Sequence, residues 1–366
     1  MKVEYFDRQQ AVNNQPTESL ARLDNCSDKP TCWSPSGTYL VVITPAKVLF
    51  LGGKDMIPII TIPQANVEAV SMSPCEKYVL TYAPKSASAF TVWDFQMVSV
   101  IRDFTDSEPG ENIGTYRWSF DGQFLAKGFR TEKEGGKIKE GITVYELPSM
   151  EILRDANGRK TSVSVAGIGT WAWAPASNML VFTQHLVSAS LMDDEKPAGP
   201  DPKVTFMEIP GRTEKATKVM KGSSKLEMTF HPQGTYLGVM NQYKLKKASQ
   251  YSVEIFDLTS RDDVPHQQVQ INRPVQIFRA VHWEPNHAKL AVHTLSQKQS
   301  EGRREYTSNP TRDGVDIYEM VRTEGQGFVV KDIGKHQCDR VTNFSWSPAG
   351  DLFVTCEKDG PSMSAK

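Results

Sequence analysis

The stretch Trp33-Ser34-Pro35-Ser36-Gly37-Thr38-Tyr39-Leu40 recurs along the chain with substitutions, so that seven copies can be aligned. Each copy opens on a large apolar residue, and these anchors are Trp33, Met72, Trp118, Trp173, Phe230, Trp283 and Trp346. Neighbouring anchors lie between 39 and 63 residues apart, which brackets the period of propeller-type repeats. The sequence therefore predicts one structural unit that is repeated with connections of variable length.

Each copy has the chemistry of a tight turn between two strands. Proline presets the φ angle of the second turn position, and glycine, asparagine or an acidic residue then accepts the positive φ that follows. The anchor becomes the last core-facing residue of one strand, and the closing Leu40 or its equivalent the first of the next. Exposed tryptophans could instead stack on bases, but recurrence at one position of every repeat favours core packing.

A second element follows each copy and alternates β-branched and aromatic residues, as in Phe90-Thr91-Val92-Trp93-Asp94. This composition is typical of a strand, and Trp93-Asp94 resembles the end of the third strand of a WD-type blade. An edge-like strand comes next, for example at 57–62 and 328–333. Four strands per repeat predict an all-β, WD40-like β-propeller with six complete four-stranded blades and partial blades at both ends.

Two arrangements of the ends remain open. We expect residues 1–26 to be the last strands of a preceding blade, residues 27–356 to be the propeller blades, and 357–366 a polar C-terminal end. The terminal pieces either combine and close a seven-bladed ring, or belong to an arc of a larger ring. The residues alone favour closure, because an open arc exposes strand edges.

Composition and motifs argue against catalysis. The 42 basic and 43 acidic residues give a formal net charge of −1, so bulk charge singles out neither nucleic acid nor membrane. No apolar run reaches the roughly 18 residues of a membrane helix, and the polar N-terminus does not read as a signal peptide. The five cysteines include no CxxC pair, and no phosphate loop, nucleophile elbow or HExxH is present. We expect an intracellular, cytoplasmic protein with free thiols that is not an enzyme and needs no cofactor, metal or small-molecule substrate.

The connections between the second and third strands grow along the chain, from 44–46 and 83–89 to 127–140, 184–203, 241–250 and 294–313. In a propeller these loops share one face, and loops held by a rigid scaffold often bind partners. They read either as solvated loops or as contacts to an acidic partner or phosphate backbone. The candidate contact residues are Lys133, Lys137, Lys139, Lys244, Lys246, Lys247, Arg303 and Arg304.

The amino-acid sequence of the repeats resembles that of the propeller in the b-subunit of eukaryotic translation initiation factor 3. The phrases that carry this resemblance are Phe50-Leu51-Gly52-Gly53 after the first copy, Ser73-Pro74-Cys75-Glu76-Lys77-Tyr78, Val92-Trp93-Asp94, Tyr145-Glu146-Leu147-Pro148-Ser149-Met150, and Trp283-Glu284-Pro285 with Lys289-Leu290-Ala291-Val292. The family's ring has nine blades, so the resemblance favours the arc. The chain shows neither the family's RNA-recognition motif nor its helical tail, and its insertions at 193–202 and 296–310 look long for the family.

The resemblance implies a non-catalytic scaffold that binds the small ribosomal subunit, through ribosomal proteins and possibly ribosomal RNA, and other subunits of initiation factor 3 during mRNA recruitment and start-site selection. No individual contact residue is carried over from the family. Two other hypotheses remain: a propeller like that of initiation factor 2A, or a general WD40 adaptor for protein interactions.

Overall fold

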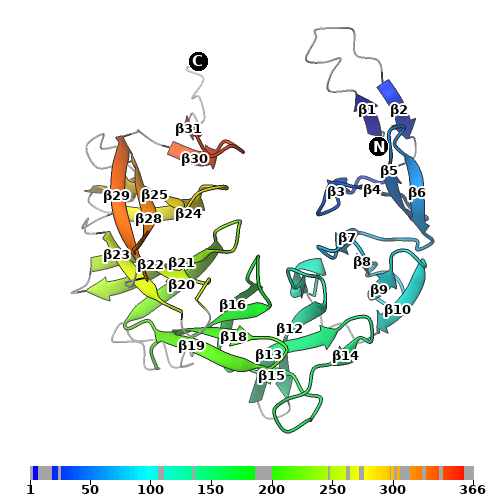
Figure 1. The fold of residues 1–366 in the computed structure, drawn as a ribbon, viewed down its shortest axis with the longest axis horizontal. Coiled ribbons are helices and arrows are strands. Elements are labelled where there is room, and N and C mark those ends of the chain that lie inside the picture. The colour runs from blue at the N-terminus through cyan, green and yellow to red at the C-terminus, as the bar shows by residue number, and fades with distance from the viewer. Residues whose placement is uncertain are drawn as a thin grey trace. The chain divides into compact units, whose positions relative to one another are not determined.

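The computed structural model describes residues 3–6, 19–23, 26–105, 111–133, 137–185, 200–245, 248–260, 264–271, 276–296, 298–300, 303–305, 314–323, 327–337 and 341–357. It divides into two compact units, Met1–Val165 and Ala166–Lys366. Both units are built from antiparallel sheets, which Figure 1 labels in chain order. The described part of the chain contains no helix long and apolar enough to cross a membrane.

The first unit holds three of the predicted sheets among its described residues. Consecutive strands are neighbours in each, as the short connections of the repeat require. The strands are β3 (Cys32–Trp33), β4 (Leu40–Ile43), β5 (Val48–Gly52) and β6 (Ile57–Ile62); β7 (Ala69–Met72), β8 (Tyr78–Tyr82), β9 (Phe90–Asp94) and β10 (Ser99–Phe104); and β11 (Tyr116–Trp118), β12 (Phe124–Lys133), β13 (Lys137–Glu146) and β14 (Glu151–Ile152). The last sheet gains β15 (Val163–Ser164) beside β13 and is preceded by the 3-10 helix η1 (Ile113–Thr115). Ahead of them, β1 (Val3–Phe6) pairs with β2 (Ser19–Leu23) in a sheet of its own.

The second unit holds the other three four-stranded sheets among its described residues. They consist of β16 (Ile168–Trp173), β17 (Met179–Gln184), β18 (Lys203–Glu208) and β19 (Thr213–Val219); β20 (Ser223–Phe230), β21 (Tyr236–Leu245), β22 (Ala248–Asp257) and β23 (His266–Ile271); and β24 (Gln276–Trp283), β25 (Lys289–Ser296), β28 (Gly314–Thr323) and β29 (Gly327–Gln337). Two smaller hairpins are β26 (Lys298–Ser300) with β27 (Arg303–Glu305), and β30 (Val341–Trp346) with β31 (Phe353–Glu357). The prediction of six four-stranded antiparallel units is therefore confirmed in the described residues.

The core lies between successive sheets of a unit. In the first sheet every residue of β4 and β5 is buried, whereas β6 begins with three exposed residues. A central strand that is covered on both faces needs a continuous apolar run rather than an alternating one, and Leu40-Val41-Val42-Ile43 supplies it. The next sheet shares this core, because Phe95 packs edge-on against Phe50 with ring centroids 4.7 Å apart.

The repeated phrase forms the same closed turn at the head of each sheet. In the first copy the N–H of Ser34 donates to the carbonyl of Tyr39, and Gly37 donates back to Ser34, both at 2.8 Å. The same five-residue bond recurs in the other six copies, from Ser73 to Tyr78, Ser119 to Phe124, Ala174 to Met179, His231 to Tyr236, Glu284 to Lys289 and Ser347 to Leu352. Gly37 has φ of 75°, and Glu76 has φ of 55° at the equivalent position.

Two of the predicted connections are strands instead of loops. The segment 127–140 continues the β12–β13 ladder as far as the pair Lys133 and Lys137, and the segment 241–250 continues the β21–β22 ladder to Leu245 and Ala248. The prediction that these two connections are loops was wrong, because the backbone ladders continue through them although their side chains are mostly polar. These connections are long hairpins that extend their sheets.

Candidate functional site

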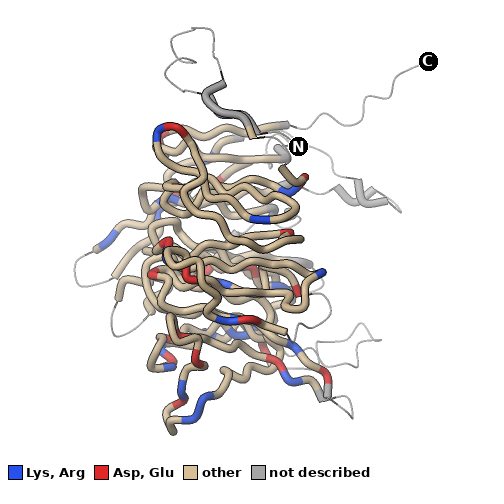
Figure 2. The backbone as a smooth tube through the Cα atoms, turned by 90° about the vertical axis from the view of Figure 1, so that its right-hand side faces the viewer, with Lys and Arg blue, Asp and Glu red and all other residues tan. Residues whose placement is uncertain are grey.

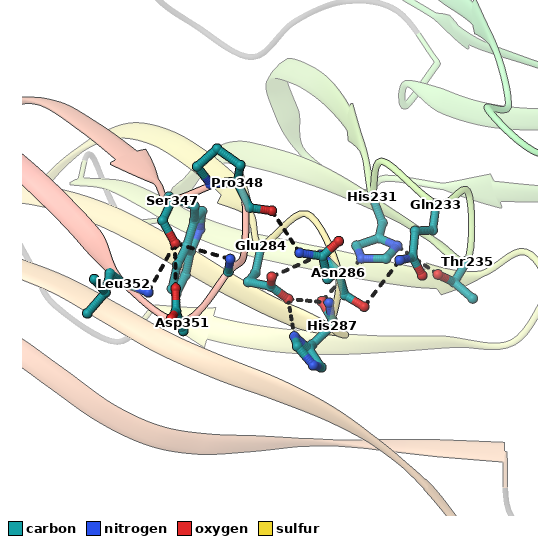
Figure 3. Close-up of polar contacts among 12 residues, drawn as sticks. His231, Gln233, Thr235, Glu284, Asn286, His287, Ser347, Pro348, Asp351 and Leu352 are labelled. Atoms are coloured by element: carbon teal, nitrogen blue, oxygen red, sulfur yellow. Dashed lines mark hydrogen bonds and ion pairs between the residues drawn. The ribbon is translucent and has the colours of Figure 1, made fainter. Parts of the chain in front are cut away.

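The closed turns of the second unit are tied to one another by side chains (Figure 3). Gln233 donates from Nε2 to the carbonyl oxygen of Asn286 in the next sheet at 3.2 Å. Asn286 in turn donates from Nδ2 to the carbonyl oxygen of Pro348, which lies in the turn between β30 and β31, at 2.8 Å. Side-chain amides at the fourth position of two turns thus link three consecutive repeats.

His231 makes a second link between two of these turns. Its Nε2 donates to the carbonyl oxygen of His287 at 3.1 Å, because a carbonyl oxygen only accepts, and its Nδ1 lies 2.7 Å from Thr235 Oγ1. A neutral imidazole with its proton on Nε2 can accept the Thr235 hydroxyl at Nδ1. Burial lowers the pKa of His231, against the opposing effects of the His287 carbonyl and the Glu284 carboxylate. The contact is therefore made by the uncharged ring.

Glu284 is a buried carboxylate that closes the turn before β25. Its side chain accepts the backbone N–H groups of Asn286 and His287, and it lies 3.1 Å from Nδ1 of His287. A Cβ atom at Gly350 would overlap this carboxylate. The glycine of one turn therefore makes room for the acid of the turn before it, which is a structural role.

The predicted anchors differ in how far they are buried. Met72, Trp173 and Trp283 are buried, whereas Trp118, Phe230 and Trp346 are half-buried. Three indoles donate to the first strand of the preceding sheet: Trp118 to Ser71 Oγ at 3.1 Å, Trp283 to the Thr229 carbonyl at 3.0 Å, and Trp346 to the His282 carbonyl at 3.2 Å.

Trp33 departs from the expectation of a core-facing anchor, because 57% of its surface is exposed. The indoles of Trp118, Trp283 and Trp346 all reach the first strand of the sheet before their own. Trp33 lies on β3, the first strand of the first of the six sheets. The named strands among the described residues ahead of it are β1 and β2, which pair with each other in a separate sheet.

The predicted contact residues lie on hairpins that project beyond the sheets. Lys133 ends β12, while Lys137 and Lys139 begin β13. Lys139 is exposed, and its Nζ lies 5.8 Å from the ring centroid of Phe129 on the partner strand. Beside it, Arg130 Nε is 3.8 Å from Glu140 Oε2. This hairpin carries mixed charge, and its lysines are spaced by neighbouring carboxylates.

The hairpins of the second unit carry the other candidates. Lys244 lies on β21 opposite Ser249, and Arg303 and Arg304 lie on β27 opposite Ser300 and Gln299. Lys246 and Lys247 lie outside the described residues. No acidic residue occurs between Gln242 and Ser252, so the tip of the β21–β22 hairpin has only positive formal charges. Along the described backbone, positions of Lys and Arg are interspersed with positions of Asp and Glu (Figure 2).

Sequence reasoning missed the residues that join the turns, above all His231, Glu284 and Asn286. Each belongs to a copy of the repeated phrase, but occupies a position where the other copies carry different residue types. For His231 and Glu284, the signal available was that an ionisable residue stands at a position that serine or alanine holds in the other copies. Its meaning depends on the neighbouring turn, which is more than 50 residues away in the chain.

Comparisons with known proteins confirm the resemblance noted in the sequence. No protein-family model matches the chain. The chain is 26% identical over 357 residues to the B-subunit of eukaryotic translation initiation factor 3 from Aedes aegypti, and 26% identical over 360 residues to the protein of the same name from Anopheles gambiae. Each match covers 94% of this chain, but only 45% and 46% of the relative. The chain thus spans about half the length of the curated relatives that it matches.

A solved structure gives a likeness of fold. The crystal structure titled as that of the eukaryotic initiation factor matches with a TM-score of 0.50 and 17% identity, over 95% of this chain and 86% of that one. The all-β architecture and the sequence similarity together make the chain a distant relative of a translation initiation factor subunit.

Proposed function

We propose that the chain is a non-catalytic scaffold of translation initiation, part of a complex like initiation factor 3, that binds the small ribosomal subunit and other factor subunits. The observation that carries the proposal is the similarity to the B-subunit of that factor along 94% of the chain. Similarity that runs through all six sheets, and is not confined to one motif, is what a shared scaffold requires.

The described sheets support a binding role. Sheets joined by shared cores and linked turns form a rigid base, and the hairpins that extend from them carry the basic residues. Such hairpins can neutralise phosphates of ribosomal RNA or meet acidic protein surfaces without rearranging the core. We propose Lys133, Lys137, Lys139, Lys244, Lys246, Lys247, Arg303 and Arg304 as contributors to this contact.

The six sheets are proposed to be blades within a larger ring, of which residues 1–26 and the β30–β31 pair are parts of further blades. The exposure of Trp33 supports this arrangement, because the indoles of Trp118, Trp283 and Trp346 each donate to the sheet before their own. We propose a cytoplasmic location and no cofactor, since the chemistry assigned to the chain is binding alone.

Sedimentation of the tagged chain from a cell extract tests the proposal. We expect it to travel with small ribosomal subunits or with a multisubunit initiation complex, and to move to light fractions when ribosomal subunits are removed. A chain that sediments alone under all conditions would contradict the scaffold role in initiation. Recovery with the ribosome but without any other factor subunit would instead favour a protein like initiation factor 2A.

A further inference from the structure

A polar groove of about 340 Å³ lies in the second unit, between β19 and the sheet formed by β20–β23. Lys218 and Lys221 line one side, and Asn241, Glu254 and Gln268 line the other. Three strands of one sheet therefore contribute to it, together with the chain segment that connects two sheets. None of these residues belongs to a closed turn, and Asn241 and Glu254 lie on β21 and β22 away from the tip of the basic hairpin that these strands form.

Two buried side chains in the groove carry hydrogen-bond acceptor oxygens without a donor among the described residues. Glu254 is 4% exposed and Asn241 is 5% exposed. They lie on adjacent strands, with Glu254 opposite Val239 and Asn241 opposite Ser252, so both side chains are on one face of the sheet. Among the described residues, Oε2 of Glu254 and Oδ1 of Asn241 have no hydrogen-bond partner. Buried polar atoms are nearly always paired in folded proteins, so these two indicate a site for a ligand.

The Glu254 carboxyl group is buried close to Lys218 and Gln268, and its Oε2 atom has no hydrogen-bond partner among the described residues. Burial raises the pKa of Glu254, and the nearby Lys218 ammonium and Gln268 amide only partly oppose this. Lys218 also makes a second contact, because its Nζ lies 2.7 Å from Nε2 of His266. Gln268 also donates to Ser252 Oγ at 3.4 Å. Oε2 of Glu254 nevertheless has no hydrogen-bond partner among the described residues.

We propose that this groove binds an arginine side chain presented by a protein partner. A guanidinium group offers several N–H donors in one plane, which suits two acceptors held on adjacent strands. It also carries the charge that an ionised Glu254 requires, and charged hydrogen bonds are the stronger ones. Lys221, exposed at the rim, can meet a carboxylate or carbonyl oxygen beside the arginine. This inference goes beyond the initiation role and does not rest on it.

The test uses the whole chain and a small probe. The protein labelled with ¹⁵N is titrated with N-acetyl-arginine amide, and the amide chemical shifts of Asn241, Glu254 and Gln268 are followed by NMR. We expect saturable shifts centred on these residues. N-acetyl-citrulline amide has the same shape without the charge, and it should bind about tenfold or more weakly, as the loss of a charged hydrogen bond implies. This comparison needs no variant and holds whether or not a mutant folds.

Glu254→Gln should weaken binding of the arginine probe by a similar factor, whereas Glu208→Gln, an exposed carboxylate on β18 paired with Lys215, should leave it unchanged. Lys218→Met removes the competing positive charge and should tighten binding. Equal affinity for the two probes, unchanged affinity in Glu254→Gln, or no saturable shift at the groove would each overturn the proposal. Because the readout involves no ribosome, failure here is distinguishable from failure of the initiation role.

Discussion

The indole Nε1 of Trp283 donates a hydrogen bond to the carbonyl oxygen of Thr229, 3.0 Å away on the first strand of the preceding sheet. The ring also stacks on Tyr236, with centroids 6.1 Å apart, and meets His231 edge-on at 5.4 Å. One residue of the repeated phrase thus belongs to the cores of two sheets at once. This relationship explains how the repeated phrase holds successive repeats together.

Trp283→Ala should destabilise the fold strongly, whereas Trp33→Ala should not. Removing a buried aromatic side chain and its cavity-filling volume costs about 3–5 kcal/mol, while a change at an exposed position usually costs under about 0.5 kcal/mol. Chemical denaturation of both variants, followed by far-UV circular dichroism, measures the difference. Equal losses in the two variants would contradict the assignment of Trp283 to a shared core.

Gly350→Ala should cost more than Gly222→Ala in the same unit. Both glycines have positive φ, 78° and 66°, so alanine strains the backbone at either position. Only at Gly350 would the new Cβ also overlap Glu284, whereas no described atom lies within 4 Å at Gly222. We expect a loss of about 1–2 kcal/mol at Gly222 and a clearly larger one at Gly350, read from thermal unfolding. Similar melting temperatures for the two variants would show that the Glu284 side chain does not restrict the residue at position 350.

The stability of the second unit should fall as the pH drops below about 6.5, the ordinary pKa of histidine. Burial lowers the pKa of His231, and also that of His282. At these two histidines the unfolded chain therefore binds more protons than the folded chain as the pH falls. The free energy of unfolding decreases accordingly. Above that range both states carry neutral imidazoles, and this contribution to stability is fully present.

His231→Gln isolates the part due to one residue. We expect the variant to lose less free energy of unfolding than the parent between about pH 7.5 and pH 5.5, because it no longer has this group to protonate. Parallel pH profiles for the parent and His231→Gln would rule out the neutral-ring contact with His287.

Charge reversal at the tip of the β21–β22 hairpin should weaken association with small ribosomal subunits. We expect Lys244→Glu combined with Lys246→Glu and Lys247→Glu to reduce binding and to flatten its dependence on salt, because each phosphate contact adds about one unit to the salt slope. The control replaces three exposed lysines outside the hairpins, Lys54, Lys77 and Lys331, by glutamate. Co-sedimentation from about 50 to 300 mM salt gives both slopes, and identical losses in the two triple variants would remove the hairpin from the interface.

Much of the fold could be read from local chemistry. The Pro-Gly turn after Trp33 specified a hairpin, and the alternation in Phe90-Thr91-Val92-Trp93-Asp94 specified a strand that the structure reproduces residue for residue as β9. The length of the hairpin strands could not be read in the same way. Polar residues from Gly128 to Lys139 look like a loop, yet the backbone of β12 and β13 pairs there without needing an apolar face.

Local sequence was enough to specify the repeat, its four strands and its closed turn, because φ preferences and side-chain periodicity act over a few residues. Packing between sheets settled which anchors are covered, how Gln233 and Asn286 join turns that are about 50 or more residues apart, and that Glu254 and Asn241 share a groove. Burial and hydrogen bonding between sheets depend on which strand lies opposite. A periodic sequence gives every copy the same local signal, so only the packing distinguishes Trp33 from Trp283.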